Sequence, residues 1–127
     1  MRTLNITEHE PGKSLESLAL TKREREALRT FVERLHQSLG ENLVKVILFG
    51  SKARAQAKRG SDIDLLVILQ KQDIQDAHEV YRAASRTDLR WRVDISPKIY
   101  SLEEYQHRRA VGALFIQEIE KNGILLT

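Results

Sequence analysis

The sequence of 127 residues contains no cysteine. Disulfide bridges and metal sites built on thiolates are therefore excluded. Hydrophobic residues make up 41% of the chain and charged residues 31%, a balance that is typical of a folded globular α/β protein and not of a disordered one. The length fits one domain, so we expect a single domain over residues 1–127.

Long apolar runs are also missing. No stretch approaches the roughly 18 uninterrupted apolar residues that cross a bilayer. The first part of the chain carries Glu8, Glu10 and Glu16, where a signal peptide needs an apolar segment. We therefore expect a cytoplasmic protein without a membrane partner.

Neither sign of charge dominates the chain, because 21 Lys and Arg residues stand against 18 Asp and Glu residues and leave a net charge of +3. The basic residues are mixed with glutamates along helical stretches, which is typical of solvated helix faces. A nucleic-acid-binding protein would show an affinity that falls steeply with salt. We rank that class last and expect no nucleic-acid partner.

The hydrophobic pattern predicts an α/β (α+β) fold in which a small mixed sheet is flanked by helices. Strands are predicted over residues 43–49, 63–69 and 91–96, and helices over residues 21–40, 52–58, 73–90 and 101–122. Thr21 with Glu24, and Ser101 with Glu104, have the spacing of capping boxes. Residues 1–20 show no sustained period, so we expect an N-terminal arm there.

Apolar residues at helical or alternating spacing are expected to face the core. They include Ile74, Val80, Tyr81, Trp91, Val111 and Leu114. In the predicted strand 91–96, Asp94 falls on the opposite, polar face.

Two aspartates one residue apart open the second predicted strand. Side chains at i and i+2 of a strand share a face, so Asp62 and Asp64 are expected to project together. Two carboxylates this close repel each other unless a cation or a proton lies between them. Mg²⁺ is the natural cation, because it prefers carboxylates and completes its shell with water and phosphate oxygens. Asp94 reaches the same place if its strand is a neighbour, and three carboxylates can hold two metal ions.

Gly50 and Ser51 directly follow the first predicted strand. A glycine there lets the backbone approach a phosphate without a Cβ in the way. If a short helix begins just after it, free N–H groups and the Ser51 hydroxyl point at the anion. The pattern therefore predicts a turn that holds phosphate beside a strand that holds the metal.

The segment LFGSKARAQAKRGSDIDLLV, residues 48–67, resembles the signature of the minimal nucleotidyltransferases of the DNA polymerase β superfamily. That signature has Gly-Ser, an Ala-Arg-Gly continuation, and then Ser-Asp-x-Asp. The ending FIQEIEKNGILL is similar to the family's closing helix and short strand, so the resemblance covers about residues 25–127. One departure is Ala55, which stands where the family usually has glycine; Gly60 is expected to supply the flexibility instead.

The resemblance implies a nucleotidyltransferase fold, ATP as the substrate and two Mg²⁺ ions as cofactors. It implies that three aspartates are the catalytic residues and the metal ligands: Asp62, Asp64 and Asp94. Asp94 is also implied as the base for the acceptor hydroxyl. Contacts to the nucleotide phosphates are implied for Gly50, Ser51, Arg54 and Ser61.

Many members of this family are antitoxins, called MNT antitoxins, that transfer AMP to a tyrosine of a helical HEPN ribonuclease toxin. The resemblance therefore implies that this chain forms a hetero-oligomer with a cognate HEPN toxin and adenylylates it. One alternative is a catalytically idle protein of the same fold that neutralises a toxin by binding alone. The three aspartates favour the enzyme, because an idle protein has no reason to keep three like charges together.

Overall fold

The computed structural model describes residues 20–54 and 61–127. The elements follow one another as α2 (Lys22–Leu39), a 3-10 turn (Gly40–Asn42), β1 (Leu43–Phe49), β2 (Ile63–Leu69), α3 (Ile74–Trp91), β3 (Ile95–Ser101), α4 (Leu102–Ala110), α5 (Leu114–Asn122) and β4 (Ile124–Leu125). The strands form one four-stranded sheet in the order β3-β2-β1-β4. β1 is antiparallel to β2 and β4, and β2 is parallel to β3. The prediction of an α/β fold with a small mixed sheet is confirmed.

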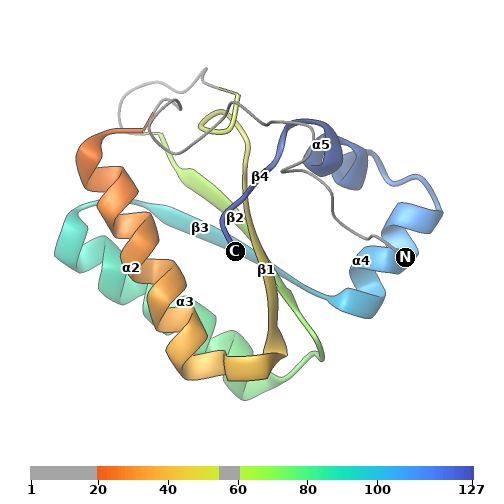
Figure 1. Ribbon diagram of the computed structural model, residues 1–127, viewed down its shortest axis with the longest axis horizontal. Coiled ribbons are helices and arrows are strands. Elements are labelled where there is room, and N and C mark those ends of the chain that lie inside the picture. Colours follow the sequence, from red (N-terminus) through yellow and green to blue (C-terminus); the bar gives the residue numbers. More distant parts are fainter. Residues whose placement is uncertain (1–19, 55–60) are drawn as a thin grey trace.

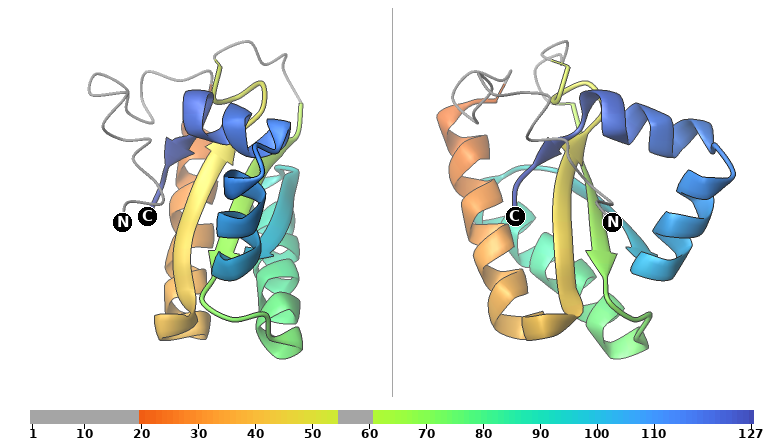
Figure 2. Two further views of the ribbon diagram at one scale, coloured as in Figure 1. Left: turned by 90° about the vertical axis from the view of Figure 1, so that its right-hand side faces the viewer. Right: turned by 45° about the vertical axis from the view of Figure 1, so that its right-hand side comes forward.

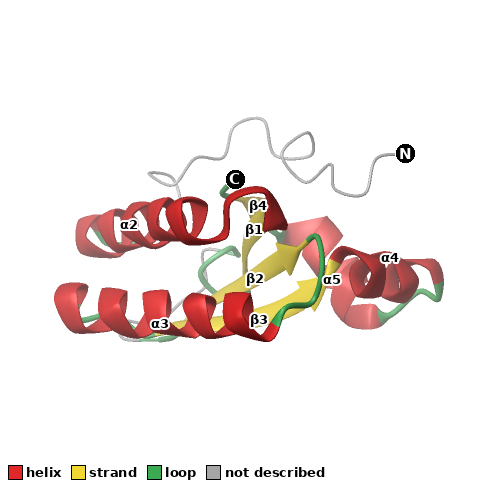
Figure 3. Cartoon of the chain, turned by 90° about the horizontal axis from the view of Figure 1, so that it is seen from below, coloured by secondary structure: helices red, strands yellow, loops and turns green. Residues whose placement is uncertain are grey.

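Helices cover both faces of the sheet (Figures 1 and 2). α2 and α3 lie side by side on one face, and α4 and α5 lie on the other (Figure 3). Alternation along β2 divides its side chains between two cores, with Leu65 and Val67 toward α2 and α3, and Leu66 and Ile68 toward α4 and α5. Asp64 therefore lies on the α4/α5 face.

The predicted capping box at the start of α2 is confirmed. The Thr21 hydroxyl oxygen accepts the N–H of Glu24 at 3.0 Å, and the Glu24 carboxylate accepts the N–H of Thr21 at 2.9 Å. A cap of this kind stabilises a helix by about 1 kcal/mol. Gly40, with φ 54°, ends the helix.

The predicted strand over residues 91–96 is wrong in its position. Trp91 is half-buried and is the last residue of α3, and Arg92 caps the helix in the left-handed conformation with φ 55°. The strand begins only at Ile95. The alternation around Val93 covers only a few residues, and the helical period of α3 continues through Trp91. The left-handed conformation of Arg92 then ends the helix before the strand can begin. Pro97 lies in β3, an edge strand, where a residue without a backbone N–H is tolerated.

The predicted final helix is two helices. Gly112, with φ 74°, separates α4 from α5. Val111 and Leu114 flank this break and are exposed, not part of an apolar face. The Ser101 hydroxyl caps α4 by accepting the N–H of Glu104 at 3.0 Å.

The inward face of α3 agrees with the prediction only in part. Val80 is buried as predicted, together with Ala83 and Ala84, but Ile74 and Tyr81 are exposed. α3 packs against both α2 and β3. The small side chains of its inward face allow this close packing.

The predicted helix over residues 52–58 is observed only as a turn over residues 51–54. Its remainder, together with Ala55 and Gly60, lies outside the described residues, as does nearly all of the expected N-terminal arm. Among the described helices, none is long and apolar enough to cross a membrane.

Candidate active site

Asp62 and Asp94 are neighbours where β2 and β3 begin. Ile63 stands opposite Ile95 in this parallel pair, and the N–H of Ile63 donates to the carbonyl oxygen of Asp94 at 2.8 Å. The hydrogen bond that joins the two carboxyl groups, and the negative charge of Asp62, raise the pKa of Asp94 above its ordinary value. The structure therefore brings the third aspartate to the first, even though the predicted strand was misplaced.

Asp64 is half-buried and pairs across the sheet with Phe49, the last residue of β1. Burial, followed by the negative charge of Asp62, raises the pKa of the Asp64 carboxyl, while the positive charge of Arg54 lowers it. Asp94 adds a further, smaller increase to this pKa. The three carboxyl groups thus act on one another electrostatically.

Gly50 turns the chain directly after β1, with φ 75°. A Cβ at this position would overlap the Oδ2 atom of Asp64 and lie 3.3 Å from its Cγ atom. Only glycine meets both the left-handed conformation and this close approach. The turn continues to Arg54, whose N–H donates to the Gly50 carbonyl oxygen at 3.3 Å. Backbone and carboxylate are therefore packed directly against each other.

Three further residues were predicted to contact phosphate: Arg54, Ser61 and Ser51. The Arg54 guanidinium forms an exposed ion pair with Glu118 of α5 at 3.3 Å. The Ser61 hydroxyl is buried and has no hydrogen-bond partner in the part of the chain that the structure describes. Ser51, next to Gly50, is half-buried. All of these groups lie at the end of the sheet where β1 ends and β2 begins, drawn at the top of Figure 1.

The donor set fits Mg²⁺, because it consists of carboxylate oxygens held near one another on a single face. Burial raises the pKa of Asp64, and Asp62 raises the pKa of both Asp64 and Asp94, so a cation bound between these groups would relieve their repulsion. Within residues 20–54 and 61–127, however, no three His, Cys, Asp or Glu side chains are placed to hold one ion together. Asp62 and Asp94 are exposed, so their side chains are free to turn toward an ion.

Residues 25–126 match the family model of the nucleotidyltransferase domain. The chain belongs to this family. A relative from Methanocaldococcus jannaschii, whose name describes it as a protein adenylyltransferase, is 30% identical over 100 residues, which cover 78% of this chain and 94% of the relative. A second, named protein adenylyltransferase MntA, from Haemophilus influenzae, is 34% identical over 74 residues, which cover 58% of this chain and 65% of that protein.

Solved structures share the nucleotidyltransferase fold. One is a toxin–antitoxin crystal structure with AMP-PNP, with a TM-score of 0.52 and 19% identity over 76% of this chain and 70% of the other. Another is a protein of Sulfolobus solfataricus described as a nucleotidyltransferase, with a TM-score of 0.50 and 21% identity over 90% of this chain and 88% of the other. At these identities the likeness concerns the fold alone. It confirms the fold that the sequence motif implied.

Lys52 is a site residue that the nucleotidyltransferase motif did not single out. Its side chain is only 3% exposed, and its Nζ atom lies 2.8 Å from the Oε2 atom of Glu24. Glu24 is the same residue that completes the cap of α2. The Gly50 turn is therefore fastened to the first turn of α2. The capping box was visible in the sequence, but nothing in the sequence indicated that Lys52 is buried against it.

Asp88 is a second residue that sequence reasoning missed. Its carboxylate accepts the N–H of Ile95 at 2.9 Å, one residue after Asp94. Burial raises the pKa of Asp88, and the hydrogen bond from Ile95 opposes that change. Asp88 thus fixes the start of β3, and with it the backbone of Asp94. No sequence signal pointed to this contact, because it depends on the left-handed turn at Arg92.

Replacing Gly50 with alanine is expected to destabilise the protein more than Gly112→Ala. The two glycines have nearly the same φ, 75° and 74°, but a Cβ at Gly112 would meet only the Gln117 Nε2 atom at 3.6 Å. Both variants lose about 1–2 kcal/mol to the left-handed conformation, and Gly50→Ala loses about 1–3 kcal/mol more through overlap with Asp64. Urea denaturation of both variants measures the difference. Equal losses would contradict the described contact.

Mg²⁺ is expected to raise the melting temperature strongly at pH 7 and weakly near pH 4. The folded-state pKa values of Asp64 and Asp94 lie above 3.8. The stability contributed by these two groups in the ion-free protein is therefore fully present below their unfolded-state pKa and is lost as pH rises through the raised values. Binding of a cation offsets that loss only where the carboxyls are charged. Thermal unfolding in MgCl₂ or EDTA at matched ionic strength tests this, and a Mg²⁺ effect that does not vary with pH would contradict it.

Proposed function

We propose that this nucleotidyltransferase transfers AMP from ATP, with Mg²⁺, to a tyrosine hydroxyl of a cognate HEPN ribonuclease toxin, and so acts as an antitoxin. The observation that carries the proposal is the placement of Asp62 and Asp94 at the start of neighbouring strands, with Asp64 packed against the Gly50 turn. Membership of the family supports the reaction class. The relatives named protein adenylyltransferases support a protein as the acceptor.

The toxin as partner is supported by the fold shared with a toxin–antitoxin structure that contains AMP-PNP. AMP-PNP is an analogue of ATP, which supports a nucleoside triphosphate as the second substrate. The HEPN class of the toxin and the tyrosine acceptor come from the sequence motif alone and are part of the proposal.

In the proposed site, Asp62 and Asp64 would hold Mg²⁺, and Asp94 would be the third ligand. When bound, Mg²⁺ neutralises charge on the phosphates and makes displacement at the α-phosphorus easier. The Gly50 turn gives the triphosphate access to backbone N–H groups, and Ser51 offers a hydroxyl. The buried Ser61 hydroxyl has no partner among the described residues and can donate to a phosphate oxygen. Arg54 adds positive charge next to Asp64.

Asp94 takes the proton of the acceptor. The tyrosine oxygen forms a bond to the α-phosphorus, the bond to pyrophosphate breaks, and the hydroxyl proton passes to the Asp94 carboxylate. A carboxylate positioned within hydrogen-bond reach of the acceptor hydroxyl can act as its general base.

The test is a labelling experiment with the purified chain and a purified helical HEPN protein from the same genome. With MgCl₂, ATP labelled at the α-phosphate is expected to label the helical protein, and ATP labelled at the γ-phosphate is not. The second nucleotide separates AMP transfer from phosphoryl transfer. Absence of α-label, or equal labelling by both nucleotides, would overturn the proposal.

A further inference from the structure

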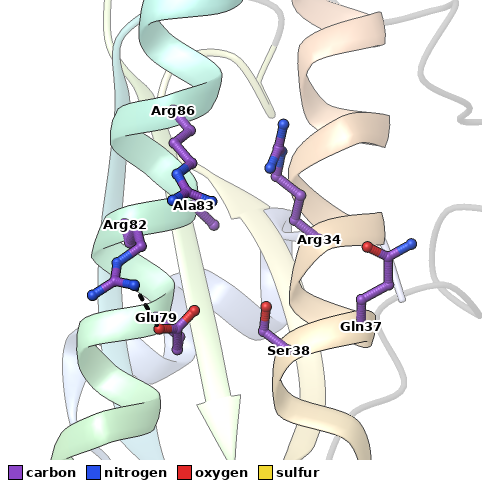
Figure 4. A pocket seen from close by; sticks show the side chains of 7 residues that line it. All are labelled: Arg34, Gln37, Ser38, Glu79, Arg82, Ala83 and Arg86. Carbon is purple, nitrogen blue, oxygen red and sulfur yellow. Dashed lines mark ion pairs between the residues drawn. The ribbon is translucent and has the colours of Figure 1, made fainter.

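A groove of about 180 Å³ lies between α2 and α3, on the sheet face opposite α4 and α5. Figure 4 shows Arg34 extending from α2 and Arg86 extending from α3 toward the gap between the helices. Ala83 lies between Arg82 and Arg86 on α3, and its small side chain leaves the gap open. Two guanidinium groups thus border one small hollow.

Neither the Arg34 nor the Arg86 guanidinium is neutralised by a carboxylate in the described part of the chain. The Nε–H group of Arg34 is buried and has no acceptor in the described part of the chain. Arg82 pairs with Glu79 at 3.4 Å, whereas Arg34 and Arg86 have no carboxylate within ion-pair distance among residues 20–54 and 61–127. A buried donor without an acceptor is unfavourable, and two like charges at one hollow repel each other. An anion between them relieves both.

The groove suits carboxylates better than a nucleic-acid strand. Guanidinium groups bind carboxylate and phosphate with similar geometry. However, Glu79 places a negative charge in the wall, and none of the lining residues is an aromatic that stacks on bases. The separate carboxylates of an acidic peptide can lie away from the Glu79 carboxylate. A continuous phosphate backbone would be repelled by it.

The surface beside the groove indicates a protein partner. Arg82, Arg86 and Arg90 are exposed at intervals of four residues along α3, so they form a basic row. Leu89, three residues from Arg86, is 84% exposed. A large apolar side chain next to arginines is typical of a surface that contacts another protein.

We propose that the α2/α3 groove binds an acidic segment of a partner protein, with carboxylates paired to Arg34 and Arg86 and an apolar side chain against Leu89. α3 carries Arg86 and ends at Trp91, shortly before Asp94 and the start of β3. That the partner is the AMP acceptor rests on the proposed function; the binding itself does not.

The binding is tested with labelled poly-L-glutamate and with single-stranded RNA of similar length, by fluorescence anisotropy on the full chain. Poly-L-glutamate is expected to bind the native protein, and Arg86→Glu is expected to weaken binding at least tenfold. Lys121→Glu on α5, an exposed site, makes the same change in net charge and is expected to have little effect. Arg86→Gln, which adds no carboxylate, is expected to give an intermediate loss.

Three results would overturn the proposal: no binding of poly-L-glutamate, tighter binding of the RNA, or equal losses in Arg86→Glu and Lys121→Glu. The link to the acceptor is tested separately in the labelling experiment. Arg86→Glu is expected to raise the KM for the toxin at least tenfold and leave the KM for ATP unchanged. If the native chain labels the toxin but Arg86→Glu changes neither KM, the acceptor assignment fails; if the native chain labels nothing, the proposed function fails.

Discussion

Replacing Asp64 with asparagine is expected to lower the rate of AMP transfer at least about a thousandfold. Asp64 is the innermost of the three carboxylates, half-buried and in contact with the Gly50 turn. Asparagine keeps the shape of the side chain but removes the charge that attracts Mg²⁺. A metal ion contributes several kcal/mol to such a reaction, and each 1.36 kcal/mol is about tenfold in rate. Single-turnover kinetics with labelled ATP measures the loss.

The matched control for this variant is Asp73→Asn. Asp73 is exposed and caps α3 by accepting the N–H groups of Gln75 and Asp76. Asparagine caps helices as well as aspartate does, so this variant is expected to retain full activity. If Asp64→Asn still neutralised the toxin as the native chain does, the protein would act by binding alone and the enzymatic account would be wrong.

Lys52→Met is expected to lower the free energy of unfolding by about 3–5 kcal/mol, because it leaves the Glu24 carboxylate buried without its partner. The Glu24 side chain lies 2.8 Å from the ammonium group, and both residues are buried. The same change removes the anchor of the Gly50 turn, so the KM for ATP is expected to rise. Urea denaturation and steady-state kinetics measure the two effects.

A double substitution separates the lost ion pair from a loss of packing. Glu24→Gln combined with Lys52→Met removes both charges. The double variant is therefore expected to be less destabilised than Lys52→Met alone. Lys52→Arg keeps the charge and is expected to recover part of the affinity for ATP. A double variant at least as unstable as the sum of the single ones would show that the ion pair does not hold this turn.

Local spacing in the sequence was sufficient for much of the fold and the site. β1 and β2 are rich in apolar residues and are each interrupted by one charged residue, and the Thr21–Glu24 box marks the start of α2 at the predicted residue. The Asp62 and Asp64 pair and the Gly50 turn follow from strand alternation and from the turn that ends β1. Each of these features depends on residues within a few positions of one another.

The features that were missed depend on single backbone conformations or on distant contacts. Arg92 ends α3 in a left-handed conformation, and Gly112 divides the last helix in the same way. The pairing of Lys52 with Glu24 joins residues 28 positions apart. The burial of Ala83, in place of Tyr81, follows from how closely α3 packs on its neighbours. None of these is encoded in a short periodic pattern.

The central claim is that Asp62, Asp64 and Asp94 together hold a metal-bound nucleotide beside the Gly50 turn. The most direct measurement is anomalous diffraction from crystals of the full chain grown with MnCl₂ and AMP-PNP, in which Mn²⁺ replaces Mg²⁺. The account predicts manganese bound by the Asp62 and Asp64 carboxylates, with Asp94 turned toward it and the phosphates against the backbone of Gly50 and Ser51. Manganese bound elsewhere, or a nucleotide that leaves these carboxylates without metal, would contradict it.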